Sequence, residues 1–172
     1  MQVVLADDHM LFRESFALVL QRMLPTALIT QVGDWDALKT HTEQVEADLL
    51  LIDLFMPGKN GWEASLAQLF EHNSCTVCII SASTDRDNVK KAFEMGVRGY
   101  IFKTASIDEM EQAIQQICAG KIYLPSFVWE KPAPKRVGKN SSTITARQKN
   151  VLELLASGES NKDIALQLGL TD

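Results

Sequence analysis

Residues 49–58 read Leu-Leu-Leu-Ile-Asp-Leu-Phe-Met-Pro-Gly, an unbroken apolar run that ends in an aspartate and a proline-glycine turn. Four consecutive branched apolar residues predict a strand that is buried on both faces, as in a parallel sheet covered by helices. Similar short runs occur at residues 3–6, 27–32, 77–80 and 100–102. The sequence therefore predicts five strands.

The segments between the predicted strands have the apolar spacing of helices. The last is the clearest, because Ser106 and Glu109 have the spacing of a capping box and Gly120 is a typical helix stop. Alternation of strands and helices predicts an α/β fold with an open, doubly wound, five-stranded parallel sheet. The apolar positions with helical spacing in the first and last segments are Leu11, Phe12, Phe16, Val19, Leu20 and Met23, and Ile107, Met110, Ile114 and Ile117.

Polar side chains stand directly after four of the predicted strands. Asp7 and Asp8 follow the first strand, Asp53 the third, Ser81 the fourth and Lys103 the fifth. In such sheets, functional groups gather beyond the carboxyl ends of the strands, so we expect these five side chains to share one pocket. Three carboxylates together favour a hard divalent cation, and Mg²⁺ is the expected cofactor. With that charge neutralised, Asp53 is the best candidate for a nucleophile that forms an aspartyl phosphate.

Two other chemical interpretations are less favoured. Cys75 and Cys78 form a C-x-x-C motif, but their odd separation near a strand places them on opposite faces, which disfavours a redox pair. His9 follows the acidic pair, yet Mg²⁺ sites rarely use imidazole, so we expect it to start a helix.

Four segments together resemble the receiver domains of bacterial response regulators, which have a flavodoxin-like fold. The resemblance covers about residues 1–122. The segments are Val4-Leu5-Ala6-Asp7-Asp8-His9, Asp53-Leu54-Phe55-Met56-Pro57-Gly58-Lys59-Asn60-Gly61, Ser81-Ala82 and Gly99-Tyr100-Ile101-Phe102-Lys103.

The resemblance implies a role for each residue of the pocket. It makes Asp53 the phosphoacceptor and a metal ligand, Asp8 the main metal-binding acid with Asp7 in support, and the backbone carbonyl of Phe55 a further ligand. It also implies that Ser81 contacts the phosphoryl group, that Tyr100 is an aromatic switch and that Lys103 is the basic partner. One position departs from many receivers, because Thr104 stands where they have proline.

The remainder of the chain differs in charge and composition. Residues 1–122 carry a net charge of −7 and residues 123–172 a net charge of +2. We interpret residues 123–142, which are rich in proline and basic residues, as a linker. Residues 143–172 have the pattern of two short helices, and their sequence resembles the first half of the LuxR-type helix-turn-helix domain of the NarL/FixJ group. The recognition helix of that domain is expected to be absent, so we predict weak or no specific DNA binding by residues 1–172.

The favoured function is a phosphorylation-controlled response regulator of a two-component system. It would accept phosphate from a sensor histidine kinase, pair as a homodimer through its receiver and act on promoter DNA in its full-length form. The alternatives are a receiver that binds partners without reading DNA, and a Mg²⁺-dependent phosphohydrolase. The hydrolase is disfavoured because the dehalogenase-type motif separates its two aspartates by one residue, whereas Asp7 and Asp8 are adjacent. We expect a cytoplasmic protein because its cysteines are few, and no membrane span because its apolar runs are short. As a phosphoacceptor regulator, it is expected to assist only its own phosphorylation and dephosphorylation and not to be an enzyme.

Overall fold

The five apolar runs form one parallel sheet in the computed structural model, which describes residues 1–72 and 74–125. The order across the sheet is β2-β1-β3-β4-β5, so β1, β3 and β4 are central and β2 and β5 lie at the edges. This topology confirms the predicted fold. The strands are β1 (Gln2–Ala6), β2 (Leu28–Val32), β3 (Leu49–Ile52), β4 (Thr76–Ser81) and β5 (Gly99–Phe102).

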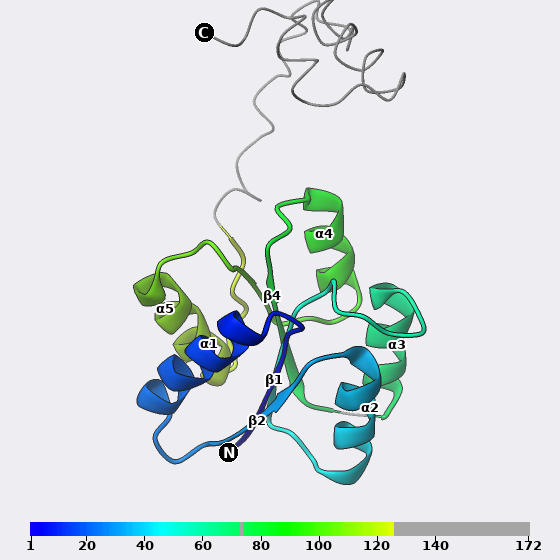
Figure 1. Cartoon of the computed structure of the whole chain (residues 1–172). Coiled ribbons are helices and arrows are strands. Elements are labelled where there is room, and N and C mark those ends of the chain that lie inside the picture. The colour runs from blue at the N-terminus through cyan, green and yellow to red at the C-terminus, as the bar shows by residue number, and fades with distance from the viewer. Residues whose placement is uncertain (73, 126–172) are drawn as a thin grey trace, which may run out of the picture. The chain divides into compact units, whose positions relative to one another are not determined.

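Helices cover both faces of the sheet, which explains the continuous apolar runs in the central strands. Figure 1 shows α1 and α5 on one side, and α2, α3 and α4 on the other. Every residue of β3 is buried, while β2 keeps exposed positions because it is an edge strand. The helices are α1 (Met10–Met23), α2 (Trp35–Gln44), α3 (Trp62–His72), α4 (Arg86–Glu94) and α5 (Ile107–Cys118).

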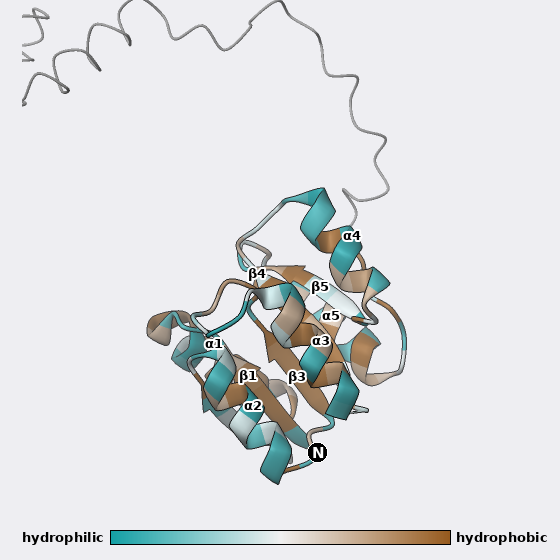
Figure 2. Cartoon of the chain, turned by 90° about the vertical axis from the view of Figure 1, so that its right-hand side faces the viewer, coloured by the Kyte–Doolittle hydropathy of each residue, from teal (hydrophilic) through white to brown (hydrophobic). Residues whose placement is uncertain are grey.

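Each face of the sheet has its own apolar core. Figure 2 shows hydrophobic strands between helices whose outer surfaces are hydrophilic. None of the described helices is long and apolar enough to span a membrane. The core on the α1 and α5 side includes Phe16, Leu20, Met110, Ile114 and Ile117, and the core on the other side includes Trp35, Leu38, Leu66, Leu69, Val89 and Ala92.

Two apolar residues of the expected helix pattern do not enter the core. Leu11 is 80% exposed and Ile107 is 52% exposed. Leu11 lies on the exposed face of α1 with Leu18, while its neighbour Phe12 packs against the core. Ile107 is the first residue of α5, and the buried part of that helix begins one turn later at Met110. Apolar spacing identified both helices correctly but assigned too many of their apolar residues to the core.

The ends of α5 follow the predicted signals. The Oγ of Ser106 accepts a hydrogen bond from the backbone N–H of Glu109 at 3.2 Å, as in a capping box. Gly120 has a φ of +77°, a left-handed conformation that glycine adopts without strain and that ends the helix.

The chain returns to the sheet after α5. Tyr123 forms a parallel bridge with Gly99 at the outer edge of β5, and its hydroxyl donates to Glu109 Oε1 at 3.1 Å. Leu124 packs against the core formed with α2, α3 and α4. The packed chain therefore continues beyond residue 122 to at least Leu124. The remainder of the expected linker and the two helices expected within residues 143–172 lie outside the described residues.

Candidate functional site

The carboxyl ends of the central strands bring two aspartates together in the interior. β1 and β3 are neighbours in register, with Ala6 opposite Ile52, so Asp7 and Asp53 leave the sheet side by side. Both are almost fully buried, at 1% and 4% exposure. Buried carboxylates are rare unless a charge or several donors accompany them, so this placement itself indicates a functional site.

Lys103 supplies that charge. Its Nζ lies 2.6 Å from Asp53 Oδ2 and 2.7 Å from Asp7 Oδ2, and its side chain is only 11% exposed. Burial opposes the charge on Lys103, but hydrogen bonds and attraction from Asp53 and Asp7 outweigh it and raise the pKa of the ammonium. The lysine therefore stays charged between two carboxylates that would otherwise repel each other.

Ser81 and Tyr100 lie on the adjoining strands. Ser81 is completely buried at the end of β4, its carbonyl accepts from the backbone N–H of Lys103 at 2.9 Å, and its Oγ accepts from the N–H of Ser83. Tyr100 is also buried, and its hydroxyl donates to the carbonyl of Ser83 at 3.1 Å. Burial raises the pKa of Tyr100 despite its hydrogen bonds with Ser81 and Ser83. The β4–α4 loop thus connects the serine at the pocket to the tyrosine beside it.

Asp8 and His9 form the outer side of the site. The Asp8 side chain is 34% exposed, and its Oδ1 lies 2.8 Å from Nδ1 of His9. The N–H of His9 donates to Asp7 Oδ1 at 2.8 Å, which orients the buried carboxylate. His9 is the N-cap residue of α1, as expected of a helix start, but its ring turns toward the acids.

The donor set fits a divalent cation. One ligand atom from each of Asp7, Asp8, His9 and Asp53 can be chosen so that all four lie within 4.8 Å of one another. Apart from its ion pair with Lys103, no described residue satisfies the buried Oδ2 of Asp7. Clustered carboxylates with spare oxygen capacity are what hard cations bind. The pocket is therefore an acidic cluster with the ligands for a metal ion.

The loop after Asp53 is tightly constrained. The N–H of Phe55 approaches Asp53 Oδ1 at 3.3 Å, and the carbonyl of Pro57 accepts from the N–H of Trp35 at 3.0 Å. A Cβ on Gly58 would come within 2.8 Å of the Trp35 Cβ, so only glycine fits there without a shift. The proline-glycine turn thus fixes the loop against α2. Phe55 itself is 54% exposed at the mouth of the site.

Two residues of α1 belong to the site but were not predicted from the sequence to do so. The ring of Phe12 lies 4.9 Å from Lys103 Nζ, a cation–π contact that shields the ammonium. Arg13 donates to the carbonyl of Asp7. For the contact of Arg13, the available signal was an arginine a few residues after the acidic pair Asp7-Asp8. Nothing in the sequence indicated the contact of Phe12, because it depends on how α1 packs against the sheet.

Two smaller questions from the sequence have answers in the structure. Every peptide bond among the described residues is trans, including the bond between Lys103 and Thr104. Cys75 and Cys78 pack in the cores on opposite faces of the sheet, as their odd spacing predicted, and both thiols are free. Burial raises the pKa of both, which disfavours the reactive thiolate.

Comparisons with known families match two parts of the chain. The family described as "Response regulator receiver domain" matches residues 3–115. The family described as "Bacterial regulatory proteins, luxR family" matches residues 142–172.

Individual relatives agree with both matches. The chain is 32% identical to the glycerol metabolism activator of Pseudomonas putida, over 99% of this chain and 82% of that protein. It is 27% identical to the nitrate/nitrite response regulator protein NarL of Escherichia coli, with the same coverage of both chains. Among solved structures, the receiver domain of the putative response regulator NarL from Mycobacterium tuberculosis is similar with a TM-score of 0.62 and 26% identity, over 70% of this chain and 97% of that chain.

Proposed function

The chain belongs to the two-component response regulators that combine a receiver domain with a LuxR-type DNA-binding domain, and we propose that its receiver is controlled by phosphorylation of Asp53. The observation that carries this proposal is the buried Asp7–Lys103–Asp53 arrangement, with Lys103 Nζ within 2.7 Å of both carboxylates. Asp53 stands at the end of the central strand β3, where a phosphoryl donor can approach from beyond the sheet.

The proposed transfer uses one carboxylate oxygen of Asp53 as the nucleophile. This oxygen forms a new P–O bond, while the bond between phosphorus and the donor breaks and the donor keeps that electron pair. The donor would be the phosphohistidine of a sensor kinase. Lys103 would move its contact from the free carboxylate to the phosphoryl oxygens, and Ser81 would offer its hydroxyl from the end of β4.

Mg²⁺ is the cofactor that we propose for the acidic cluster. Asp8, Asp53 and the carbonyl of Phe55 would bind it, with Asp7 in support. When bound, the ion neutralises charge on the carboxylates and on the transferred phosphoryl group. The exposed position of Asp8 gives the ion access from solvent.

Mass spectrometry of the intact protein tests the phosphoacceptor. Incubation with acetyl phosphate and Mg²⁺ should add one phosphoryl group to the wild type, and Asp53→Asn should remain unlabelled because an amide is not a comparable nucleophile. Asp48→Asn is a matched control, since Asp48 flanks the other end of β3 and should leave labelling unchanged. Equal labelling of Asp53→Asn and wild type would contradict the assignment.

The proposed output is pairing of receivers, which would present the DNA-binding parts to a promoter. Capture of the Ser81 hydroxyl by the phosphoryl group would change the β4–α4 loop, where the Ser83 carbonyl holds Tyr100. Sedimentation with and without beryllofluoride, a phosphoryl mimic, should show a shift from monomer to dimer. Tyr100→Ala should reduce the shift, and an unchanged association state in the wild type would argue against pairing as the output.

A further inference from the structure

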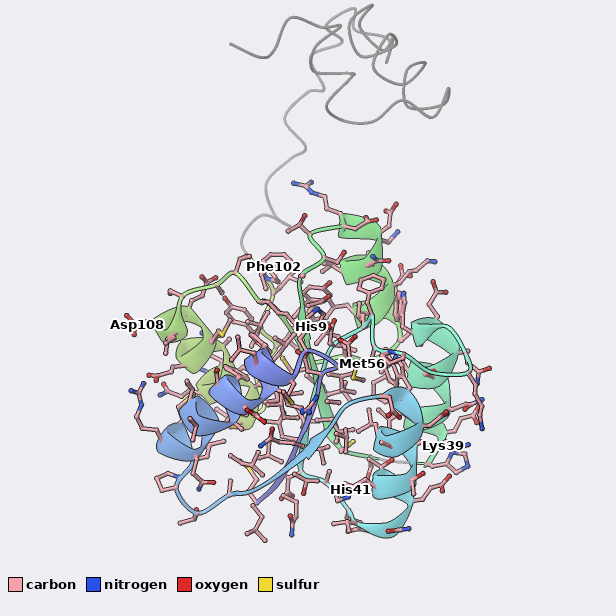
Figure 3. The ribbon with its side chains drawn as sticks, in the orientation of Figure 1. His9, Lys39, His41, Met56, Phe102 and Asp108 are labelled. Atoms are coloured by element: carbon pink, nitrogen blue, oxygen red, sulfur yellow. The ribbon has the colours of Figure 1, made fainter. Side chains whose placement is uncertain are left out.

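His9 adds a nitrogen donor to a pocket whose other donors are oxygens. Its Nδ1 lies 2.8 Å from Asp8 Oδ1 and 3.4 Å from Asp7 Oδ1. The ring is 70% exposed, so burial does not force it toward the acids. Figure 3 shows His9 in the loop beyond the strands, and His41 apart from it on α2. The imidazole therefore lies at the open side of the acidic cluster.

The spacing of the four donors is close to that of an octahedral site. Opposite ligands of an ion with bonds of about 2.1 Å lie roughly 4.2 Å apart, and the four donor atoms here lie within 4.8 Å of one another. Small rotations of the exposed Asp8 and His9 side chains can close that gap, whereas the buried Asp7 and Asp53 are held by Lys103. The flexible half of the site thus contains the nitrogen donor.

A nitrogen donor changes which ions the pocket favours. Mg²⁺ prefers oxygen ligands and water, so it gains little from an imidazole. Ions such as Co²⁺, Ni²⁺ and Zn²⁺ bind imidazole well, and their affinity for mixed N and O sites exceeds that of the lighter ions.

We propose that His9 is a fourth protein side-chain ligand for divalent transition ions, so that the phosphorylation pocket binds Ni²⁺-type ions more tightly than Mg²⁺. This inference rests on the acidic metal site proposed above. In the metal-free protein, the 2.8 Å contact of Nδ1 with Asp8 Oδ1 favours a hydrogen on Nδ1. On binding an ion, Nδ1 would give its lone pair to the metal and the exposed ring would carry its hydrogen on Nε2 instead. Asp8 would then bind the metal beside His9 instead of contacting the imidazole.

The competing role for His9 is to hold Asp8 in place without touching the ion. A positioning contact of this kind would affect every cation that Asp8 binds to a similar degree. If His9 is instead a ligand, its removal should weaken Ni²⁺ binding selectively, because Ni²⁺ binds imidazole well and Mg²⁺ gains little from it. Comparison of Ni²⁺ with Mg²⁺ therefore separates the two roles.

Calorimetric titration of the whole chain with NiCl₂ and with MgCl₂ provides the test. His9→Ala should weaken Ni²⁺ binding about tenfold or more and change Mg²⁺ binding less than about twofold. His41→Ala is the matched control and should change neither, because His41 lies in the last turn of α2, apart from His9 in Figure 3, and does not belong to the acidic cluster. Unchanged Ni²⁺ affinity in His9→Ala, or equal losses for both ions, would overturn the proposal.

Two further measurements keep this test separate from that of the acidic site. Substoichiometric Ni²⁺ should broaden the ring-proton NMR signals of His9 and leave those of His41 and His72, the other two histidines of the chain, sharp. Asp8→Asn should weaken binding of both ions. If Asp8→Asn changed neither affinity, the proposed acidic metal site would fail; if it weakened both while His9→Ala did nothing, only the role of His9 would fail.

Discussion

Asp48 and Asp53 flank the same strand, yet the two ends of β3 give them different environments. Asp48 is exposed, and its Oδ2 accepts a hydrogen bond from the backbone N–H of Gln2 at 2.6 Å. Asp53 is buried, and its Oδ2 contacts the ammonium of Lys103 at 2.6 Å. One carboxylate fastens the start of β1 to β3, and the other lies in an acidic pocket with a cation.

This difference shows that the end of the strand, rather than the residue type, determines what an aspartate can do here. The carboxyl ends of β1, β3, β4 and β5 all contribute polar side chains to one place. At the amino end of β3, the chain closes the sheet with backbone bonds, such as the bond from Asp48 N to the carbonyl of Gln2. The Asp48 carboxylate at that end is exposed and accepts a backbone N–H, whereas Asp53 faces a buried cation.

Removal of Lys103 should have the largest effect on stability, because it changes the buried end of β3. Lys103→Ala leaves Asp7 and Asp53 buried together without their cation, and loss of one partner from a buried ion pair lowers the free energy of unfolding by about 3–5 kcal/mol. Urea denaturation at pH 7 measures this change. Mg²⁺ should restore part of the stability, because it replaces the lost positive charge at the same carboxylates.

An exposed lysine provides the control for that experiment. Lys91 forms an equally short ion pair with Glu63, 2.7 Å between Nζ and Oε1, but both side chains are about half exposed. Lys91→Ala should therefore lower the free energy of unfolding far less than Lys103→Ala does, because solvent screens an exposed ion pair. Equal losses of stability in Lys103→Ala and Lys91→Ala would show that burial does not make the Lys103 ion pair more important for stability than an exposed pair.

Asp48→Ala should have an intermediate effect on stability, and it tests the exposed end of β3. It removes the acceptor for the Gln2 N–H, and loss of one such hydrogen bond lowers the free energy of unfolding by about 1 kcal/mol. Labelling by acetyl phosphate should stay at the wild-type level. A variant that folds but loses labelling would contradict the separation between the two ends of β3.

The sequence was informative where a signal is local. The four apolar residues of β3, followed directly by Asp53, were enough to predict a buried strand that delivers a carboxylate to the edge of the sheet. Asp7 and Lys103 could be placed in the same pocket because functional groups of such a fold gather beyond the carboxyl ends of its parallel strands. These predictions needed only periodicity and topology.

Contacts that depend on helix packing could not be predicted in this way. The position of Phe12 against Lys103 depends on how α1 packs against the sheet, and apolar spacing describes Phe12 only as a core residue. The turn of the exposed His9 ring toward Asp8 depends on a rotamer, which spacing does not specify. The exposure of Leu11 likewise depends on the rotation of α1 about its axis, which turns Phe12 toward the core and leaves Leu11 and Leu18 in solvent.

The two tyrosines of the chain also differ in where they lie relative to the acidic pocket. Tyr100 lies beside Ser81 near the acidic pocket, while Tyr123 lies where the returning chain meets the start of β5. Partial burial, together with the hydrogen bond and negative charge of Glu109, raises the pKa of Tyr123 to about 12. Burial also raises the pKa of Tyr100. Both hydroxyls therefore keep their protons in the folded state at a pH where an unfolded tyrosine, with a pKa of about 10, has lost its own.

Alkaline pH should consequently reduce the free energy of unfolding. Part of this reduction comes from Tyr123 and should be absent in Tyr123→Phe. Below about pH 10 both states keep the proton of Tyr123, and between about pH 10 and 12 only the folded state does, so stability falls as pH rises. One group can contribute a slope of at most about 1.4 kcal/mol per pH unit, and solvent around this partly exposed ring makes the effect smaller. Urea midpoints of Tyr123→Phe should fall less between pH 10 and 12 than those of the wild type.

Tyrosinate absorbance in Glu109→Gln should appear at lower pH than in the wild type, because the carboxylate charge that disfavours ionisation is gone. An unchanged tyrosinate titration in Glu109→Gln would show that Glu109 does not govern the ionisation of Tyr123.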